Sequence, residues 1–424
     1  MQYFKKILLG STMLYSTIFG DTLSEAFKAA EVDGEVRVVY YGRDADNSIL
    51  AKASGVAVGG HLGITTAPIY NTKASVVFYT TNPIDPSTTL MPNTNLVDGT
   101  DGYTIVGEAN IEYNDGTNML KVGRQTLATP LVASDDARVI KDLFEAANFT
   151  STILPKTKLH LLYIHRNSGM DNGDSNYNPA VSKKDFVAMS TTLNASYKKG
   201  MVVVGIENSP VENLKVSAWY YGGLDFINMY YGDASYLYKQ SKDLSLKFEG
   251  HLWNIKSTSR FDKDREDVGR KVDYLFGGVR LSAIYKEYVF QLAQERIDYA
   301  DKAGSVHTAW GMYSEYTYGF LMGSGMYGAL NGYQDSYIQK VDATKLTAIY
   351  NFAKGATLYG SYNWWRGDND AFQSNLDTID ILVTWPCMLV ENGRWQVIYE
   401  NWNSKSNNIM VDNNLARVKY TYTF

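Results

Sequence analysis

Apolar and polar residues alternate along many stretches of this chain, and residues 416–424 show the pattern most clearly. The apolar and aromatic set is Ala416, Val418, Tyr420, Tyr422 and Phe424, and the polar set is Arg417, Lys419, Thr421 and Thr423. Because successive side chains of a β-strand point to opposite faces, this stretch predicts a strand with one apolar and one polar face. The sequence ends on an aromatic residue, and we therefore expect this strand to close a barrel with lipid outside and water inside.

The same alternation recurs through the rest of the chain. Its apolar sets are Val36, Val38 and Tyr40; Tyr103, Ile105, Ala109, Ile111 and Tyr113; Leu244, Leu246, Phe248 and Leu252; Leu346, Ala348, Tyr350 and Phe352; and Trp395, Val397 and Tyr399. Polar and charged residues occupy the positions between them. Aromatic residues near the ends of several stretches are typical of the girdle at a membrane interface. We expect each apolar set to face lipid and each polar set to face water.

The predicted connections fall into a short class and a long class, which is typical of a membrane barrel. Short turns are predicted at 114–116, 154–156, 209–213, 239–242, 354–355 and 391–393, with a break near Lys286. Long polar segments are predicted at 81–102, 125–142, 167–199, 255–270, 298–339 and 366–375. With both termini on the short-turn side, this register predicts an all-β antiparallel barrel of about 18 strands, in an even-numbered range of about 16 to 20. The range allows for an extra hairpin from 185–197 and 306–320.

Composition agrees with one large sheet. The 424 residues include 33 Tyr, 8 Trp and 35 Gly but only 1 Cys and 9 Pro, which excludes a disulfide framework. The mean hydropathy of -0.26 resembles that of a soluble protein, but half of each barrel strand faces water, so the average does not exclude a barrel. A formal net charge of -5 argues against a nucleic-acid partner.

Residues 1–20 have the pattern of a signal peptide: Lys5 and Lys6 precede an apolar stretch, and Gly20 is a small residue at a plausible cleavage point. We therefore expect export, with a retained membrane anchor as the alternative. Residues 21–33 have apolar residues at helical spacing and predict a short lead-in that can form helical turns. Residues 34–424 are predicted to form a single barrel domain.

Two stretches carry a family resemblance. Residues 122–138, VGRQTLATPLVASDDAR, are followed by Phe-Glu-Ala at 144–146. This run resembles the Gly-Arg-Gln, Thr-Pro-Leu and Ser-Asp-x-x-Arg run of the OprD-type outer-membrane porins, especially their Campylobacter and Helicobacter relatives. Residues 57–63, with 74–79 behind them, are similar to the early hairpin of that group. The resemblance implies an 18-stranded passive channel for small hydrophilic solutes or ions in a Gram-negative outer membrane, narrowed by the loop at 125–142, which folds inward.

The same loop supplies the candidate constriction. The candidate residues are Arg124, Asp135, Asp136 and Arg138. Charges in a narrow passage act strongly on a passing ion, because the low-dielectric walls weaken screening. Two alternatives remain open. Asp136 and Arg138 can pair to hold the loop in shape, and Arg124, which shares the parity of Leu120, can reach water or brace the loop from the strand end.

Charged residues of the water-facing parity are candidates for the channel wall. They are Arg37, Glu108, Glu112, Lys121, Lys247, Glu249, Arg394, Arg417 and Lys419. The basic members resemble the basic ladder of OprD-type channels. Because glutamates share the same predicted surface, an ordinary wall of mixed sign is the alternative, and the ion preference stays open.

Enzymatic chemistry has no support in the sequence. None of the 5 histidines has a nearby Ser or Cys in a recognisable nucleophile context, and a water-filled barrel needs no cofactor or metal. The alternatives are a surface adhesion or structural barrel with a blocked lumen and a barrel phospholipase. The expected partners are outer-membrane lipid, small solutes, and the barrel-assembly machinery through the strand that ends at Phe424. Both a monomer and a homotrimer remain open.

Overall fold

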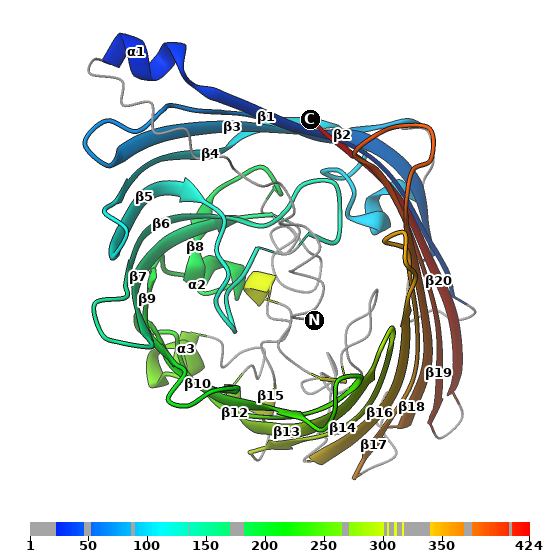
Figure 1. The fold of residues 1–424 in the computed structure, drawn as a ribbon. Helices are drawn as coiled ribbons and strands as arrows, with labels where there is room; N and C mark the ends of the chain where they lie inside the picture. Colours follow the sequence, from blue (N-terminus) through cyan, green and yellow to red (C-terminus); the bar gives the residue numbers. More distant parts are fainter. Residues whose placement is uncertain are drawn as a thin grey trace.

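Eighteen long antiparallel strands form a closed ring in the computed structural model (Figure 1). The structure describes residues 23–45, 52–85, 90–134, 136–169, 182–264, 271–300, 303–304, 309–311, 316–317, 340–368, 375–406 and 409–424. The predicted signal peptide lies outside these residues. Among the described helices, none is long and apolar enough to cross a membrane.

The first nine long strands are β1 (Glu31–Ala45), β2 (Ala53–Thr65), β3 (Thr72–Pro83), β4 (Tyr103–Asn114), β5 (Asn118–Gln125), β6 (Leu143–Ser151), β7 (Thr157–Ser168), β9 (Met201–Asn208) and β10 (Leu214–Gly223). The other nine are β11 (Ile227–Lys239), β12 (Leu244–Ser257), β13 (Lys271–Tyr285), β14 (Tyr288–Tyr299), β16 (Lys340–Asn351), β17 (Thr357–Gly367), β18 (Asn375–Pro386), β19 (Gly393–Ser406) and β20 (Ile409–Thr423). Two-residue strands, β8 (Val187–Ala188) and β15 (Ala303–Gly304), pair with β7 and β13. The helical segments are α1 (Leu23–Lys28), η2 (Met91–Thr94), α2 (Met189–Thr192), α3 (Ser259–Asp264) and η4 (Ala309–Gly311).

The barrel closes where β1 pairs with β20. The two strands are antiparallel, with Glu35 opposite Thr423 and Tyr41 opposite Arg417. One residue beyond the pair of Glu35 and Thr423, Gly34 and Phe424 exchange two backbone hydrogen bonds of 3.0 Å each. A sheet that closes on itself leaves no edge of unpaired N–H and C=O groups, which a strand in lipid could not tolerate. The predicted antiparallel barrel of about 18 strands is therefore confirmed.

One end of the barrel holds the start of β1 and the end of β20, and the connections there are short turns. Most connections at the other end are longer, as predicted. Several short turns contain a residue with positive φ: Gly116, Lys156, Asn213, Lys286, Gly355 and Asn392. This backbone conformation suits the tight reversal between two antiparallel strands. At the opposite end, the connections after β3, β5, β7, β12 and β14 are long, whereas the connection between β10 and β11 has only three residues, 224–226, and that between β19 and β20 has only two, 407–408.

Exposure separates the two faces of each strand. On β14, Phe290 and Leu292 are 55% and 48% exposed, whereas Ala293 and Glu295, on the other parity, are buried. In a closed ring the side chains on the concave inner face crowd together, whereas those on the convex outer face spread apart, so the more exposed parity is the outer one. The outer surface is thus apolar, as the alternation predicts, and the inner surface carries the polar residues.

The apolar outer surface ends at a row of charged pairs. Arg296 of β14 lies 2.6 Å from Asp342 of β16, and Arg366 of β17 lies 2.7 Å from Asp377 of β18. Arg296 shares the outward parity of Leu292. The change from apolar to charged side chains along one strand face marks the boundary between hydrocarbon and the polar interface.

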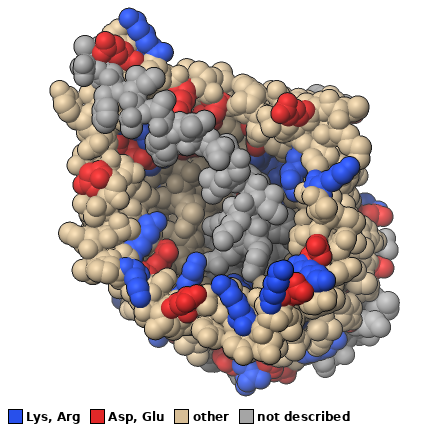
Figure 2. Space-filling model, viewed as in Figure 1, with Lys and Arg blue, Asp and Glu red and all other residues tan. Residues whose placement is uncertain are grey.

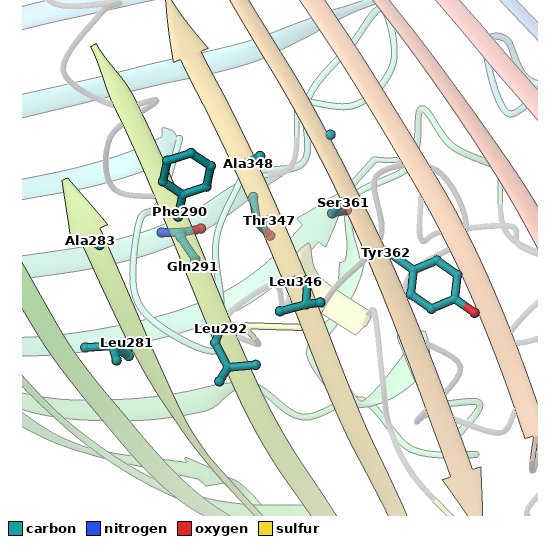
Figure 3. Close-up of a pocket in the computed structure, with 11 residues that line it drawn as sticks. Leu281, Ala283, Phe290, Gln291, Leu292, Leu346, Thr347, Ala348, Ser361 and Tyr362 are labelled. Carbon is teal, nitrogen blue, oxygen red and sulfur yellow. The ribbon is translucent and has the colours of Figure 1, made fainter. Parts of the chain in front are cut away.

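A shallow groove of about 610 Å³ crosses the outer surface over β13, β14, β16 and β17 (Figure 3). Small residues, Ala283, Ala348 and Gly360, alternate there with the larger Phe290 and Leu292. A Cβ built on Gly360 would meet nothing within 4 Å, so this position is open to the surroundings. An apolar groove of this kind fits hydrocarbon rather than water.

One predicted face is wrong. The alternation places Tyr103 and Ile105 with Ile111 on the lipid side, but the structure packs Tyr103 and Ile105 against an inner cluster that contains Tyr79. The reason is an extra residue, Gly107, between the positions of β4 that pair with Phe78 and Val77 of β3. Such a bulge reverses the parity of every residue beyond it.

The two faces predict opposite responses to a new charge. Leu292→Lys places an ammonium in the apolar band and should lower the free energy of unfolding by about 2 to 4 kcal/mol if the residue lies near the midplane. Gln291→Lys, one residue away on the inner face, should be tolerated. Urea unfolding in lipid vesicles measures both. Equal destabilisation by the two variants would contradict the assignment of the faces.

The closing strand predicts the effect of a one-residue truncation. Deleting Phe424 removes two backbone hydrogen bonds and a ring that lies over Gly34, where an added Cβ would be only 2.3 Å from the ring. The amount of heat-modifiable, membrane-inserted protein should fall, and Phe424→Tyr, which keeps the ring and the backbone, should assemble normally. Normal assembly of the truncated chain would show that Phe424 is not needed for closure.

Candidate functional site

Basic residues gather on the inner face where β1 meets β20, which we call the seam. Arg37 of β1 and Arg417 of β20 are buried, at 4% and 6% exposed, and Lys419 of β20 has the same inward parity. Val36 and Tyr40, on the other parity of β1, are exposed on the outside. The alternation of each strand thus brings three cations from the two ends of the chain to one inner surface.

The three cations bind three successive backbone carbonyl groups of the β5–β6 connection. Lys419 Nζ donates to the carbonyl oxygen of Asp136 at 3.3 Å, and Arg417 Nη1 donates to that of Ala137 at 2.6 Å. Arg37 Nη1 donates to that of Arg138 at 3.3 Å. Charge-assisted hydrogen bonds are stronger than neutral ones, so residues 136–138 are held against the seam.

The Asp136 carboxylate adds an ion pair. Arg37 Nη2 donates to Asp136 Oδ2 at 3.0 Å, and Arg37 Nη1 contacts the other carboxylate oxygen. Arg37 also pairs with Glu35 of its own strand. Desolvation raises the pKa of Asp136, but the charges of Arg37 and Lys419 outweigh it and hold the pKa well below its usual range. Asp136 is therefore ionised at every physiological pH.

Arg138 points away from this cluster. Its Nε donates to the carbonyl oxygen of Thr94, in η2, at 3.0 Å, and its guanidinium lies 4.5 Å from the ring centroid of Tyr41. With 8% of its surface exposed, the side chain is committed to packing between the β3–β4 connection and β1. The alternative in which Asp136 pairs with Arg138 is not the observed arrangement, because each has another partner.

The same connection contacts the opposite wall of the barrel. The backbone N–H of Leu131 donates to the hydroxyl group of Tyr221, on β10, at 3.1 Å. Leu131 and Val132 belong to a buried cluster with Tyr221. Because β10 is the ninth of the eighteen long strands, it lies across the ring from the seam, where Ala137 meets Arg417. Leu131 and Ala137 therefore contact opposite walls of the barrel.

Of the other two candidate constriction residues, only Arg124 is among the described residues, and it lies away from the seam. Arg124, at the end of β5, donates to Glu145 Oε1 of β6 at 3.1 Å and to the carbonyl oxygen of Val106 of β4 at 2.9 Å. It braces three strands and does not contact the seam cluster. Asp135 lies outside the described residues.

The remaining predicted wall residues are mostly paired with neighbours. Glu112 lies 3.5 Å from Lys121, and Lys247 lies 2.5 Å from Glu249. The wall residues Glu108 and Arg394 form hydrogen bonds: Tyr79 donates to Glu108 at 2.8 Å, and Arg394 donates to Thr384 Oγ1 at 3.0 Å. Charged side chains of both signs surround the hollow of the molecule (Figure 2). Because basic and acidic residues share the inner surface, the channel wall is of mixed sign.

A second attachment point was missed by the sequence analysis. Glu295 of β14 is buried and accepts hydrogen bonds from the backbone N–H groups of Tyr316 and Thr317, at 2.6 and 2.8 Å. His251 Nε2 of β12 lies 2.9 Å from the same carboxylate, and Arg280 stacks on the Tyr316 ring at 4.3 Å. The inward parity of Glu295 was visible in the sequence, but its loop partner was not.

A closed barrel with an apolar outer surface and a charged inner surface is the architecture of an outer-membrane channel protein. The sequence model of one protein family, described as outer membrane porin, OprD family, matches residues 82–301, which are 220 of the 424 residues. The chain therefore belongs to the OprD family. Its members are channels of the Gram-negative outer membrane and not enzymes. No curated protein matches the chain.

Several solved structures have a barrel fold similar to that of this chain. Pseudomonas aeruginosa OccK9 (OpdG) has a TM-score of 0.72 at 15% identity, over 94% of this chain and 100% of that one. Pseudomonas aeruginosa OpdK with vanillate has a TM-score of 0.71 at 15% identity, over 94% and 99%. Acinetobacter baumannii OccAB4 has a TM-score of 0.69 at 14% identity, over 93% and 98%. At these identities the likeness shows the fold alone.

The burial of Arg138 predicts a structural role. Arg138→Ala removes a charge-assisted hydrogen bond to a buried carbonyl group and a cation–π contact, and should lower the free energy of unfolding by about 1.5 to 3 kcal/mol. Arg260→Ala is the control, because Arg260 also has an ion pair and an aromatic partner but is half exposed, and should cost less than about 1 kcal/mol. Urea unfolding measures both. An equal cost would show that burial does not strengthen the Arg138 contacts.

Proposed function

We propose that the protein is a passive diffusion channel for small hydrophilic solutes or ions, and that the segment 126–142 folds inward and narrows it. The observation that carries this proposal is the pair of contacts on opposite walls, Leu131 with Tyr221 and Ala137 with Arg417. A chain segment that crosses a water-filled barrel removes part of the conducting cross-section, so a solute must pass close to that segment.

The proposal gives the charged residues different roles. Asp135 and Asp136 are the carboxylates assigned to the constriction, where Arg37 neutralises Asp136 at close range. Arg124 and Arg138 support the segment, through β6 and through Thr94, and do not meet the solute. The wall residues that form ion pairs act only weakly on a passing ion, because the electric fields of two opposite charges a few ångströms apart largely cancel.

Several finer points belong to this proposal. We assign the barrel-assembly machinery as the partner that recognises the C-terminal strand with Phe424, and outer-membrane lipid as the surroundings of the apolar face. Export by residues 1–20, the likeness to Campylobacter and Helicobacter relatives, and the choice between a monomer and a homotrimer stay predictions.

Solute flux through the purified protein in liposomes tests the function itself. Swelling in small sugars or amino acids, with larger solutes excluded, is the expected result for a channel. A chain variant that lacks residues 128–134 should admit larger solutes and show a higher single-channel conductance, because a resistance in series is removed. Absence of flux in the intact protein would favour a barrel with a blocked lumen and an adhesive or structural task.

A charge change in the segment should outweigh the same change on the wall. Asp136→Asn leaves the positive charge of Arg37 without its nearest carboxylate on the segment and should shift the reversal potential in a salt gradient toward anions. Glu112→Gln removes one negative charge at the wall, where Lys73 and Lys121 flank the carboxylate at 3.3 and 3.5 Å. Planar-bilayer recordings compare the two variants. A larger shift from Glu112→Gln would place the selective region away from the segment.

A further inference from the structure

The seam differs from every other junction between long strands. Each neighbouring pair from β1 to β20 is joined by a stretch of chain, whereas β1 and β20 are the two ends of the barrel and meet only through their ladder. The cations that hold residues 136–138 come from both sides of this junction: Arg37 from β1, and Arg417 and Lys419 from β20.

An apolar cluster also lies at the seam, next to these polar contacts. Val139, the next residue along the segment, is buried in a cluster that contains Val39 of β1 and Leu415 of β20. A Cβ built on Gly59 of β2 would lie 2.8 Å from Val139 Cγ1 and 2.0 Å from the Thr80 carbonyl oxygen, so only glycine leaves room for Val139 there. Residues 136–138 therefore bind both strands of the seam through polar contacts, and Val139 lies in an apolar cluster to which both strands contribute.

We propose that residues 136–139 are an internal strap that stabilises the closed seam, and that Arg37, Arg417 and Lys419 are positioning residues for this strap. This role goes beyond the channel function and does not depend on whether the segment limits conductance. The basic residues of the seam are then bound to protein carbonyl groups and are not a free track of charge for solutes.

Two consequences follow from the geometry. The binding surface for the strap exists only when β1 and β20 are paired, because each strand supplies part of it. By thermodynamic reciprocity, a segment that binds only the closed seam must stabilise closure by the free energy of that binding. The strap thus resists opening at the one junction that has no covalent connection.

A double-mutant cycle on the full chain tests the strap. Arg417→Met with Lys419→Met removes both donors from β20 and keeps the apolar stems. In the intact barrel this pair of changes should speed unfolding about tenfold, since one charge-assisted hydrogen bond is worth at least that factor. In a chain that lacks residues 133–139, the same changes should add much less acceleration, because the bond of Arg417 to Gln396 of β19 is then the one described hydrogen bond left for them to remove. Lys247→Met, which removes an inner cation paired with Glu249 on β12, is the matched control and should change the unfolding rate by the same factor in both backgrounds.

Hydrogen exchange gives a second, local measurement. Backbone amides of β1 and β20 should exchange faster in the Arg417→Met, Lys419→Met protein and in the shortened chain, while those of β12 and β13 should not change. If the double variant does not assemble, Arg417→Gln alone and the shortened chain still give the exchange result. Equal acceleration of unfolding with and without the segment, or unchanged exchange at the seam, would overturn the strap even if conductance responds to the loop.

Discussion

The structure depends on one constraint: a strand in lipid must have every backbone N–H and C=O group paired within the protein. The pairing of β1 with β20 meets this constraint by removing both free edges of the sheet. An even number of strands, termini at one end and short turns at that end follow from it, because an antiparallel sheet must return to its starting side before it can close. The inner surface is then enclosed, which makes a channel possible.

The enclosed surface uses most of its charges locally. Buried or half-buried cations need partners, because desolvation disfavours an isolated charge. At the seam the partners are carbonyl groups of the β5–β6 connection, and on β12–β14 they are the Glu249 carboxylate, which pairs with Lys247 and Arg280, and the ring of Tyr316, which lies against Arg280. The electrostatic character of the channel therefore depends on charges left after this pairing, and a list of inward-facing residues overstates it.

The fold is shared with structures of only about 15% identity. This is physically reasonable because the outer surface requires only apolar side chains at alternate positions and the turns require only a tight reversal, so many sequences meet both conditions. The contacts that attach the connections to the inner wall involve particular donors and acceptors, such as Arg37 with Asp136. Such details belong to this chain and cannot be read from the likeness of the barrels.

The sequence by itself determined the class of the barrel, an even number of about 18 strands, most of the division into two faces and the closing strand, because these are properties of local periodicity and turn chemistry. Only the tertiary structure decided where the periodicity fails, at Gly107 of β4 and at His165 of β7, since a bulge depends on the partner strand. It also decided which candidate charges meet: Arg37 binds Asp136, 99 residues away, while Arg138 turns to Thr94, 44 residues away. Contacts over such separations are set by how the closed ring places distant segments, and no local pattern encodes them.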